Sequence, residues 1–312
     1  MHGKGGTSSN SPIELNVWHH LLFSFDGQTD RFYIDGELVS IRDDDPYNDT
    51  STNFVKIGHE ANHPTRYWKG DLDEIMIWDR ALYDWEISQL YDIPVAHWKF
   101  DEGMHDGECC SDGGDIVYDS SDNEYHGTIY GGRDEWVEGI NGSALRFEAG
   151  TDYVVVNDDG ETSLASEKFT ISVWFIWDDL DSNETQFLIG KGEEHYEIHT
   201  GENNGIMFIP AGHPETHIYV EEVIHSGWNH VVVTYDDTQS LIYFDGILVA
   251  SRNITSSAAP DDDEAPLFFG RRDGHSESSF EGIMDEIAIW NRALSSEEIL
   301  ELYFSPMLYF QI

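Results

Sequence analysis

Short apolar and aromatic runs, each bounded by turn-forming residues, recur along most of the 312-residue chain. Runs rich in β-branched and aromatic residues and bounded by Gly, Asp, Asn, Ser or Pro predict strands. Helical periodicity is scarce, and its best case is "LSSEEILELY", where Ser295 can cap a helix and Glu298 follows three residues later. Many short strands at such spacing predict a sandwich or barrel. Clear examples are 153–156, 169–177, 187–190, 205–209 and 266–270.

One apolar block occurs twice. "WHHLLFSFDGQTDRFYIDG" (18–36) aligns with "WNHVVVTYDDTQSLIYFDG" (228–246) at an offset of 210 residues, and "DEIMIWDRAL" (73–82) aligns with "DEIAIWNRAL" (285–294) at an offset of 212. In the first pair, two strand-like runs flank a turn-rich spacer, which predicts a hairpin. The offset is far longer than a solenoid or propeller repeat, so it indicates whole domains.

The repeat predicts an uneven division of the chain. We expect a partial domain over 1–93, a complete domain over 94–304, and a C-terminal strand or tail over 305–312, because "MLYFQI" aligns with the apolar "VAHWKF" (95–100). An open sandwich exposes apolar faces and unpaired edges. We therefore predict that another chain completes the partial domain, as a homo-oligomer or with another structural protein. The alternative is a small sheet packed on the complete domain.

The charge balance is extreme, with 61 acidic against 16 basic residues and a net charge of −45. Such a chain repels nucleic acid and anionic lipid, so we expect neither nucleic-acid binding nor membrane insertion. No apolar run approaches the roughly 20 residues of a membrane span. The acidic residues are interleaved with aromatic ones, which favours a folded protein of a high-salt environment, from a halophile or its virus. The start, "MHGKGG", is not a signal peptide.

These motifs in combination resemble the laminin-G-like, concanavalin A-like jelly-roll family, of the bacterial and archaeal type. The strongest stretch is "GIMDEIAIWNRALSSEEILELY", and "HWKFDEG" and "WVEGINGSALRFEAGTDYVVV" fit the opening of such a domain. The resemblance covers 95–304 in full and 13–93 in part. It implies an all-β fold of two packed antiparallel sheets. We interpret four tryptophans as core residues rather than sugar platforms: Trp98, Trp174, Trp228 and Trp290.

Motifs specific to catalysis are missing. Related folds also host glycoside hydrolases, which use two carboxylates about 5 to 9.5 Å apart. With 61 acidic residues, some pair will lie at that distance by chance. The sequence contains no hydrolase strand motif, nucleophile elbow, zinc-binding H-E-x-x-H or Walker loop. We predict that the chain is not an enzyme, and a glycoside hydrolase or accessory domain is the less favoured alternative.

The resemblance also implies a structural Ca²⁺ near the point where the opening segment meets the last strands. Calcium takes six to eight oxygen ligands from carboxylates and carbonyls. Candidates in this region are Asp101, Asp119, Asn123 and Asp285. A second candidate set lies in "DLDSN": Asp179, Asp181 and Asn183. For any one acidic residue, a solvated surface charge is the simpler interpretation.

Binding of glycans, glycoproteins or surface proteins is the work that the resemblance implies. A sugar site needs aromatic faces with nearby polar groups. Candidates by position are Trp177, His195, Tyr196, His213 and Tyr219. We hypothesise a non-catalytic recognition or adhesion protein, extracellular or on a virion surface, that binds the glycosylated surface of a halophilic host. The alternative is an assembly protein that decorates a particle without binding sugar.

Overall fold

The computed structural model divides into two compact units, Met1–Ile93 and Pro94–Ile312. The residues that it describes are 19–43, 56–58, 67–73, 75–83, 87, 90, 94–103, 115–121, 123–131, 135–157, 164, 168–180, 184–192, 195–210, 216–236, 238–254, 265–274 and 278–308.

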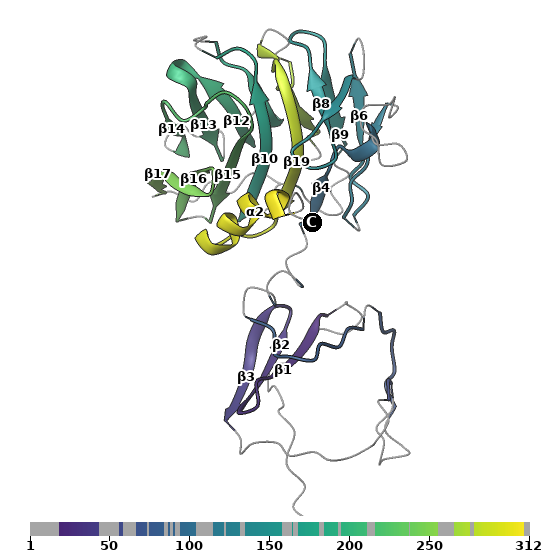
Figure 1. Ribbon diagram of the computed structural model, residues 1–312. Coiled ribbons are helices and arrows are strands. Elements are labelled where there is room, and N and C mark those ends of the chain that lie inside the picture. The colour runs from purple at the N-terminus through teal and green to yellow at the C-terminus, as the bar shows by residue number, and fades with distance from the viewer. Residues whose placement is uncertain are drawn as a thin grey trace, which may run out of the picture. The chain divides into compact units, whose positions relative to one another are not determined.

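The second unit is a sandwich of two eight-stranded antiparallel sheets (Figure 1). The first, which we call the helix-side sheet, has the order β17 (Ile247–Asn253), β16 (Gln239–Phe244), β15 (Asn229–Tyr235), β10 (Phe169–Trp177), β19 (Gly282–Trp290), β8 (Ser143–Phe147) and β7 (Glu135–Glu138), and β4 (Ala96–Trp98) also pairs with β19. The second, the open sheet, has the order β14 (Ile218–Val220), β13 (Gly205–Ile209), β12 (Tyr196–Gly201), β11 (Phe187–Lys191), β18 (Leu267–Phe269), β9 (Tyr153–Val156), β6 (Gly127–Tyr130) and β5 (Ile116–Val117). Two short 3-10 helices, Asp101–Gly103 and Glu202–Asn204, complete the unit. The predicted all-β antiparallel jelly-roll fold is confirmed.

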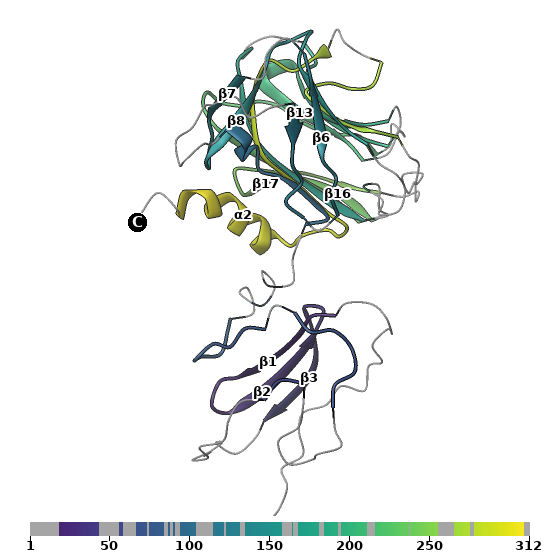
Figure 2. The same cartoon turned by 90° about the vertical axis from the view of Figure 1, so that its right-hand side faces the viewer.

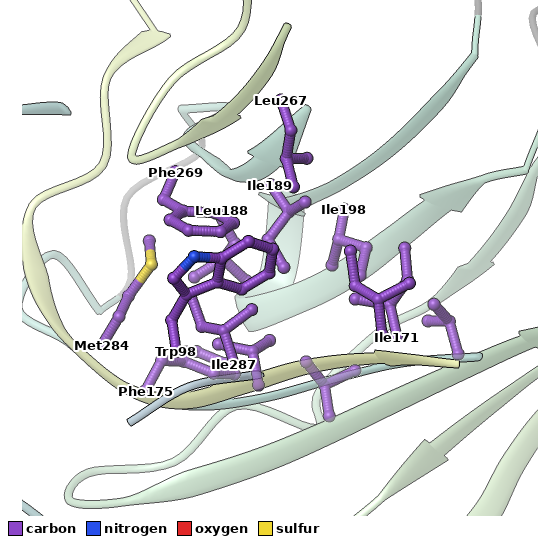
Figure 3. Close-up of a cluster of buried hydrophobic side chains, with 14 of the residues drawn as sticks. Trp98, Ile171, Phe175, Leu188, Ile189, Ile198, Leu267, Phe269, Met284 and Ile287 are labelled. Carbon is purple, nitrogen blue, oxygen red and sulfur yellow. The ribbon is translucent and has the colours of Figure 1, made fainter. Parts of the chain in front are cut away.

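The main core fills the space between the two sheets (Figure 3). Trp98 is fully buried, lies edge-on to Phe269 with ring centroids 4.9 Å apart, and donates its indole N–H to the Tyr125 carbonyl at 2.7 Å. A buried Trp needs such a partner for its single donor. Of the other tryptophans interpreted as core residues, Trp174 and Trp290 are buried, whereas Trp228 is partly exposed.

Helix α2 (Ser296–Leu308) packs on the outer face of the helix-side sheet, near its lower end in Figures 1 and 2. The predicted capping box is present: the Glu298 N–H donates to Ser295 Oγ at 3.3 Å, and the Ser295 N–H donates to Glu298 Oε2 at 2.7 Å. Arg292 adds an ion pair to Glu298 at 2.7 Å. On the inner side of α2, Ile299 is fully buried in a cluster that includes Trp290.

Of the strand or tail predicted over 305–312, residues 305–308 form the end of a helix, because α2 continues through Pro306 to Leu308. Ile299, Leu302 and Pro306 repeat at helical spacing, and this apolar stripe extends the helix beyond the point where alignment suggested a strand. Residues 309–312 lie outside the described residues.

The described part of the first unit contains one three-stranded antiparallel sheet, β1 (Leu21–Phe25), β2 (Thr29–Ile34) and β3 (Glu37–Asp43). It reproduces β15, β16 and β17 in detail. Leu21 pairs with Ile34 as Val231 pairs with Phe244. The β2–β3 register shifts after Phe32, and the β16–β17 register shifts after the equivalent Ile242, 210 residues later. The sequence repeat is therefore a repeat of structure down to its β-bulge.

The turn after the second strand is also the same in both units. The His20 N–H donates to Asp35 Oδ1 at 2.9 Å, and the His230 N–H donates to Asp245 Oδ1 at 3.0 Å. Asp35 and Asp245 both have positive φ angles, 52° and 49°, and each is followed by a glycine that tolerates such a backbone.

Candidate binding face

The outer face of the open sheet carries aromatic side chains because its strands alternate. In β9, Val154 and Val156 are fully buried in the core, and Tyr153 and Val155, which alternate with them, are on the opposite face. The same alternation in β6 places Ile129 against the core and Tyr130 outside, where it is 46% exposed. Helix α2 covers the other sheet, so within the described residues this face has no helix over it.

Six of these outward residues form one transverse row, which we call the aromatic strip. Each comes from a different strand of the open sheet: Tyr130, Tyr153, Phe187, His199, Met207 and Tyr219. Adjacent members are direct cross-strand partners on either side of β18: Tyr130 with Tyr153, Phe187 with His199, His199 with Met207, and Met207 with Tyr219. Such neighbours interact through their side chains, so the strip consists of two runs that lie on either side of β18, and Phe187, at the β18 end of the second run, is buried.

At one end of the strip, Tyr130 and Tyr153 stack with ring centroids 5.1 Å apart and an interplanar angle of 9°. The Arg271 guanidinium lies over the Tyr153 ring, 3.4 Å from its centroid, and 5.3 Å from the centroid of Phe268. Such cation–π contacts hold a guanidinium in place. Tyr130 and Arg271 thus occupy the two faces of the Tyr153 ring, and this end offers the exposed Tyr130 ring near a guanidinium that is held in place.

The other end of the strip is more polar. Phe187 lies 5.1 Å from the His199 ring. Burial lowers the pKa of His199, which keeps its imidazole neutral near pH 7. On the adjoining row, buried Glu197 pairs with Arg272, with Oε1 and Nε 2.9 Å apart. At the edge, Tyr219 donates its hydroxyl to the Glu202 carbonyl.

The five predicted ligand-binding residues do not lie together on the aromatic strip. Tyr219 lies in the aromatic strip, and His213 lies outside the described residues. Trp177 and Tyr196 were wrongly predicted as sugar platforms, because both are core side chains on the inner face of their strands. The Trp177 indole donates to Gln186 Oε1 at 2.9 Å. His195, next to Tyr196, is also buried, with 6% of its surface exposed.

The predicted calcium ligand Asp119 is a hydrogen-bond acceptor that organises a turn. Its carboxylate accepts the N–H groups of His97 at 2.8 Å, Ser121 at 2.9 Å and Tyr125 at 3.0 Å, and the Ser121 hydroxyl at 2.6 Å. Nearby, Asn123 donates its side-chain amide to the Val95 carbonyl at 2.9 Å. Oxygen lone pairs committed to N–H donors do not fit a Ca²⁺ site.

Asp285 and Asp101 also accept backbone hydrogen bonds. Fully buried Asp285 accepts the N–H of Ile140 at 2.8 Å and that of Glu286 at 2.8 Å, and burial raises its pKa well above the usual value. Burial likewise raises the pKa of Asp101, which accepts the Ser143 N–H at 3.1 Å. Both carboxylates thus accept backbone N–H groups, and calcium at these two residues stays a prediction.

The second calcium candidate is only partly visible. Asp179 Oδ2 accepts the side-chain amide of Gln186 at 3.1 Å, and Asp181 and Asn183 lie outside the described residues. No three His, Cys, Asp or Glu side chains among the described residues are arranged to hold a metal ion. Calcium at this segment stays a prediction.

The Asp119 network has a direct consequence for stability. Asp119→Ala is expected to lower the free energy of unfolding by about 3 kcal/mol, because it leaves buried N–H donors without an acceptor. Urea denaturation of the purified chain measures this change. Asp115→Ala, at an exposed position near the same turn, is the control and is expected to change stability by less than about 0.5 kcal/mol. Equal effects of the two substitutions would contradict this role for Asp119.

No helix among the residues that the structure describes is long and apolar enough to cross a membrane.

A family model described as the Concanavalin A-like lectin/glucanases superfamily matches residues 2–88 and 148–300. The chain belongs to this superfamily. The family resemblance inferred from the motifs is therefore confirmed, and both repeated blocks lie within the matched segments. This membership establishes the fold and leaves the ligand to be inferred from the site.

One curated relative is the non-toxic nonhemagglutinin type D of Clostridium botulinum D phage, 24% identical over 177 residues, which are 55% of this chain and 14% of that protein. The chain thus spans only a small part of this relative.

Two solved structures share the fold. Domain 4 of AbnA, a GH43 extracellular arabinanase of Geobacillus stearothermophilus solved with arabinotriose, matches with a TM-score of 0.52 and 20% identity, over 67% of this chain and 98% of that one. The binding domain of botulinum neurotoxin serotype D/C matches with a TM-score of 0.54 and 13% identity, over 69% of this chain and 52% of that one.

Proposed function

We propose that the second unit is a non-catalytic recognition domain that binds carbohydrate on the aromatic strip. The observation that carries this proposal is the stacked pair Tyr130 and Tyr153 with Arg271 fixed beside it. A sugar ring has apolar C–H faces and polar edges, so it suits a flat aromatic surface flanked by hydrogen-bonding groups. Here the exposed Tyr130 ring, which stacks on Tyr153, offers the surface, and the guanidinium and phenol groups offer the hydrogen bonds.

The charges on this face favour binding over hydrolysis. A glycosidase needs two carboxylates that flank the scissile bond. None of the six strip residues is acidic, and Glu197 on the adjoining row is buried and paired with Arg272. The six strip residues therefore offer rings for a sugar and contribute no carboxylate to cleavage.

The partners of proteins with the same fold support a ligand on a cell surface. The arabinanase domain was solved with a trisaccharide, and the binding domain of botulinum neurotoxin DC was solved with rat synaptotagmin II. We infer that the partner of this chain is a glycan or glycoprotein outside the cell or on an envelope. The net charge of −45 suits such encounters at high salt, where screening weakens repulsion between surfaces.

The strip is tested by removing its exposed rings. A glycan array screened with the full chain identifies a ligand, and titration calorimetry then measures its affinity. Tyr130→Ala and Tyr153→Ala are each expected to weaken binding about tenfold, which corresponds to about 1.4 kcal/mol. Tyr118→Ala is the matched control, because Tyr118 is 52% exposed next to edge strand β5 and lies outside the strip.

Two results would overturn this function. One is the absence of glycan binding at both low and molar salt. The other is an equal loss of affinity in the Tyr118→Ala control and the two strip variants, which would place the ligand elsewhere.

A further inference from the structure

One arginine beside the aromatic strip, Arg271, pairs with no carboxylate within the described residues, although acidic residues outnumber basic ones by 61 to 16. Its guanidinium contacts the rings of Tyr153 and Phe268 instead. Five other arginines of the described chain each pair with a carboxylate: Arg31, Arg42, Arg146, Arg272 and Arg292. Arg271 therefore keeps a positive charge that the protein's own carboxylates do not neutralise.

The turn that ends β18 holds Arg271 over Tyr153. Gly270 has a φ angle of 83°, and a Cβ atom at this position would lie 2.5 Å from Phe147 Cδ1, so glycine is needed here. The Gly270 N–H donates to the Leu188 carbonyl at 2.9 Å, which fixes the turn to β11. The two ring contacts then hold the guanidinium in one position before any ligand arrives.

The guanidinium presents its two Nη groups to the solvent. Nε of Arg271 is buried without a hydrogen-bond partner, whereas the Nη groups, which make no hydrogen bond to a described residue, are not buried. Two coplanar Nη groups match the two oxygens of a carboxylate or of another oxyanion. Asp152, next to Tyr153 in sequence, does not fill this role, because its carboxylate accepts the Glu148 N–H and the Thr151 hydroxyl, each at 2.9 Å.

The exposed ring of Tyr130 lies near this guanidinium. The Arg271 guanidinium carbon is 3.4 Å from the Tyr153 ring centroid, which is 5.1 Å from the Tyr130 ring centroid. The guanidinium and the Tyr130 ring are thus separated by no more than the sum of these two distances. One short oligosaccharide can therefore contact both, with a sugar ring at Tyr130 and a charged substituent at Arg271.

We propose that Arg271 makes the aromatic strip selective for anionic sugars, whose carboxylate or sulfate group pairs with the guanidinium while a sugar ring packs against Tyr130. This inference rests on the proposed carbohydrate-binding function and adds the class of ligand. A hydrogen bond between charged groups is roughly twice as strong as one between neutral groups. Because the guanidinium is already held in place, little of its conformational freedom is lost on binding.

The negative charge of the whole protein does not prevent this pairing at high salt. At low salt, a net charge of −45 repels an anionic ligand. At about 1 M salt, charges are screened over roughly 3 Å, so distant carboxylates have little effect on the ligand. A partly buried pair in direct contact is screened much less.

An array of uronate, sialate, sulfated and neutral oligosaccharides tests the class of ligand with the full chain at molar salt. Anionic oligosaccharides are expected to bind at least about tenfold more tightly than neutral ones of the same length. The carboxylated and sulfated sets show which anionic group Arg271 prefers.

Calorimetry then compares the tightest carboxylated oligosaccharide with its methyl ester, or the tightest sulfated one with its desulfated form. Removal of the ligand's charge is expected to weaken binding to the wild type at least about tenfold and to leave binding to Arg271→Gln unchanged. Arg146→Gln is the matched control, because Arg146 pairs with Asp178 on the helix-side sheet, and it is expected to behave like the wild type.

The wild-type comparison needs no variant, so it stands even if Arg271→Gln does not fold. Arg271→Lys keeps the charge without the planar guanidinium and is expected to keep part of the preference for anionic oligosaccharides. Two results overturn the inference and leave the proposed function intact: equal affinity for anionic and neutral oligosaccharides, and an equal effect of ligand charge on the wild type and Arg271→Gln. Absence of binding to every oligosaccharide would overturn the proposed function itself, and this inference with it.

Discussion

At about pH 4, the His230→Gln variant is expected to retain about 3 kcal/mol of unfolding free energy that the wild-type protein loses on acidification from pH 7. Burial lowers the pKa of His230 from 6.5 to about 3. The unfolded chain takes up a proton at this position as the pH falls below 6.5, whereas the folded chain does not. Stability is therefore present above the unfolded pKa and is lost progressively as the pH falls towards 3.

The surroundings of His230 explain why it stays neutral. The side chain is fully buried, and its ring stacks on Trp174 at 4.6 Å and faces Tyr303 at 6.0 Å. Nε2 lies 2.8 Å from the Ser172 hydroxyl, and Nδ1 has no hydrogen-bond partner among the described residues. These neighbours are neutral, so they do not stabilise an imidazolium in this apolar setting.

Urea denaturation of both proteins at pH 7 and at about pH 4, at one salt concentration, measures the difference. Buried Asp285 and partly buried Asp101 have raised pKa values, so they favour the folded state as the pH falls. Both proteins share these groups, and their contribution cancels in the comparison. If the stability difference between the two proteins is the same at both pH values, His230 is not the group responsible for acid sensitivity.

The repeated blocks allowed more of the fold to be predicted than strand patterns alone. The match between 18–36 and 228–246 fixed two hairpins of the same length, and the structure shows the same register and the same bulge in both. The capping box at Ser295 was readable because its partner, Glu298, is close in sequence. The end of α2 could not be predicted in the same way. The apolar residues of "MLYFQI" resemble a strand, although the helical spacing of apolar residues continues from Ile299 to Pro306.

The candidate site could be predicted only in part, because alternation along a strand does not say which face is outside. Trp177 and Tyr153 both lie in apolar runs next to acidic residues. Only the packing of two sheets places Trp177 inside, against Gln186, and Tyr153 outside, under Arg271. Sequence spacing also did not reveal the hydrogen-bonding role of Asp119, because the backbone donors that occupy its oxygens come from residues 97 to 125.

Raising NaCl from about 0.1 M to about 2 M is expected to raise the Tm of the protein by roughly 10 °C, corresponding to a few kcal/mol for a domain of this size. The charge responsible is the excess of 61 acidic over 16 basic residues. Several arginines already pair with one carboxylate each, such as Arg146 with Asp178 and Arg292 with Glu298. The few basic residues cannot neutralise the remaining carboxylates, whose mutual repulsion opposes the compact state until salt screens it over a few ångströms.

Differential scanning calorimetry over a series of salt concentrations at pH 7 and at about pH 4 separates screening from other effects of salt. Added salt also strengthens apolar burial, and that contribution does not depend on carboxylate charge. Protonation at about pH 4 removes part of the negative charge, so the gain in Tm per unit of salt is expected to shrink there. A gain of the same size at both pH values would assign the effect to apolar burial. A Tm that does not change with salt at pH 7 would contradict a protein adapted to high salt.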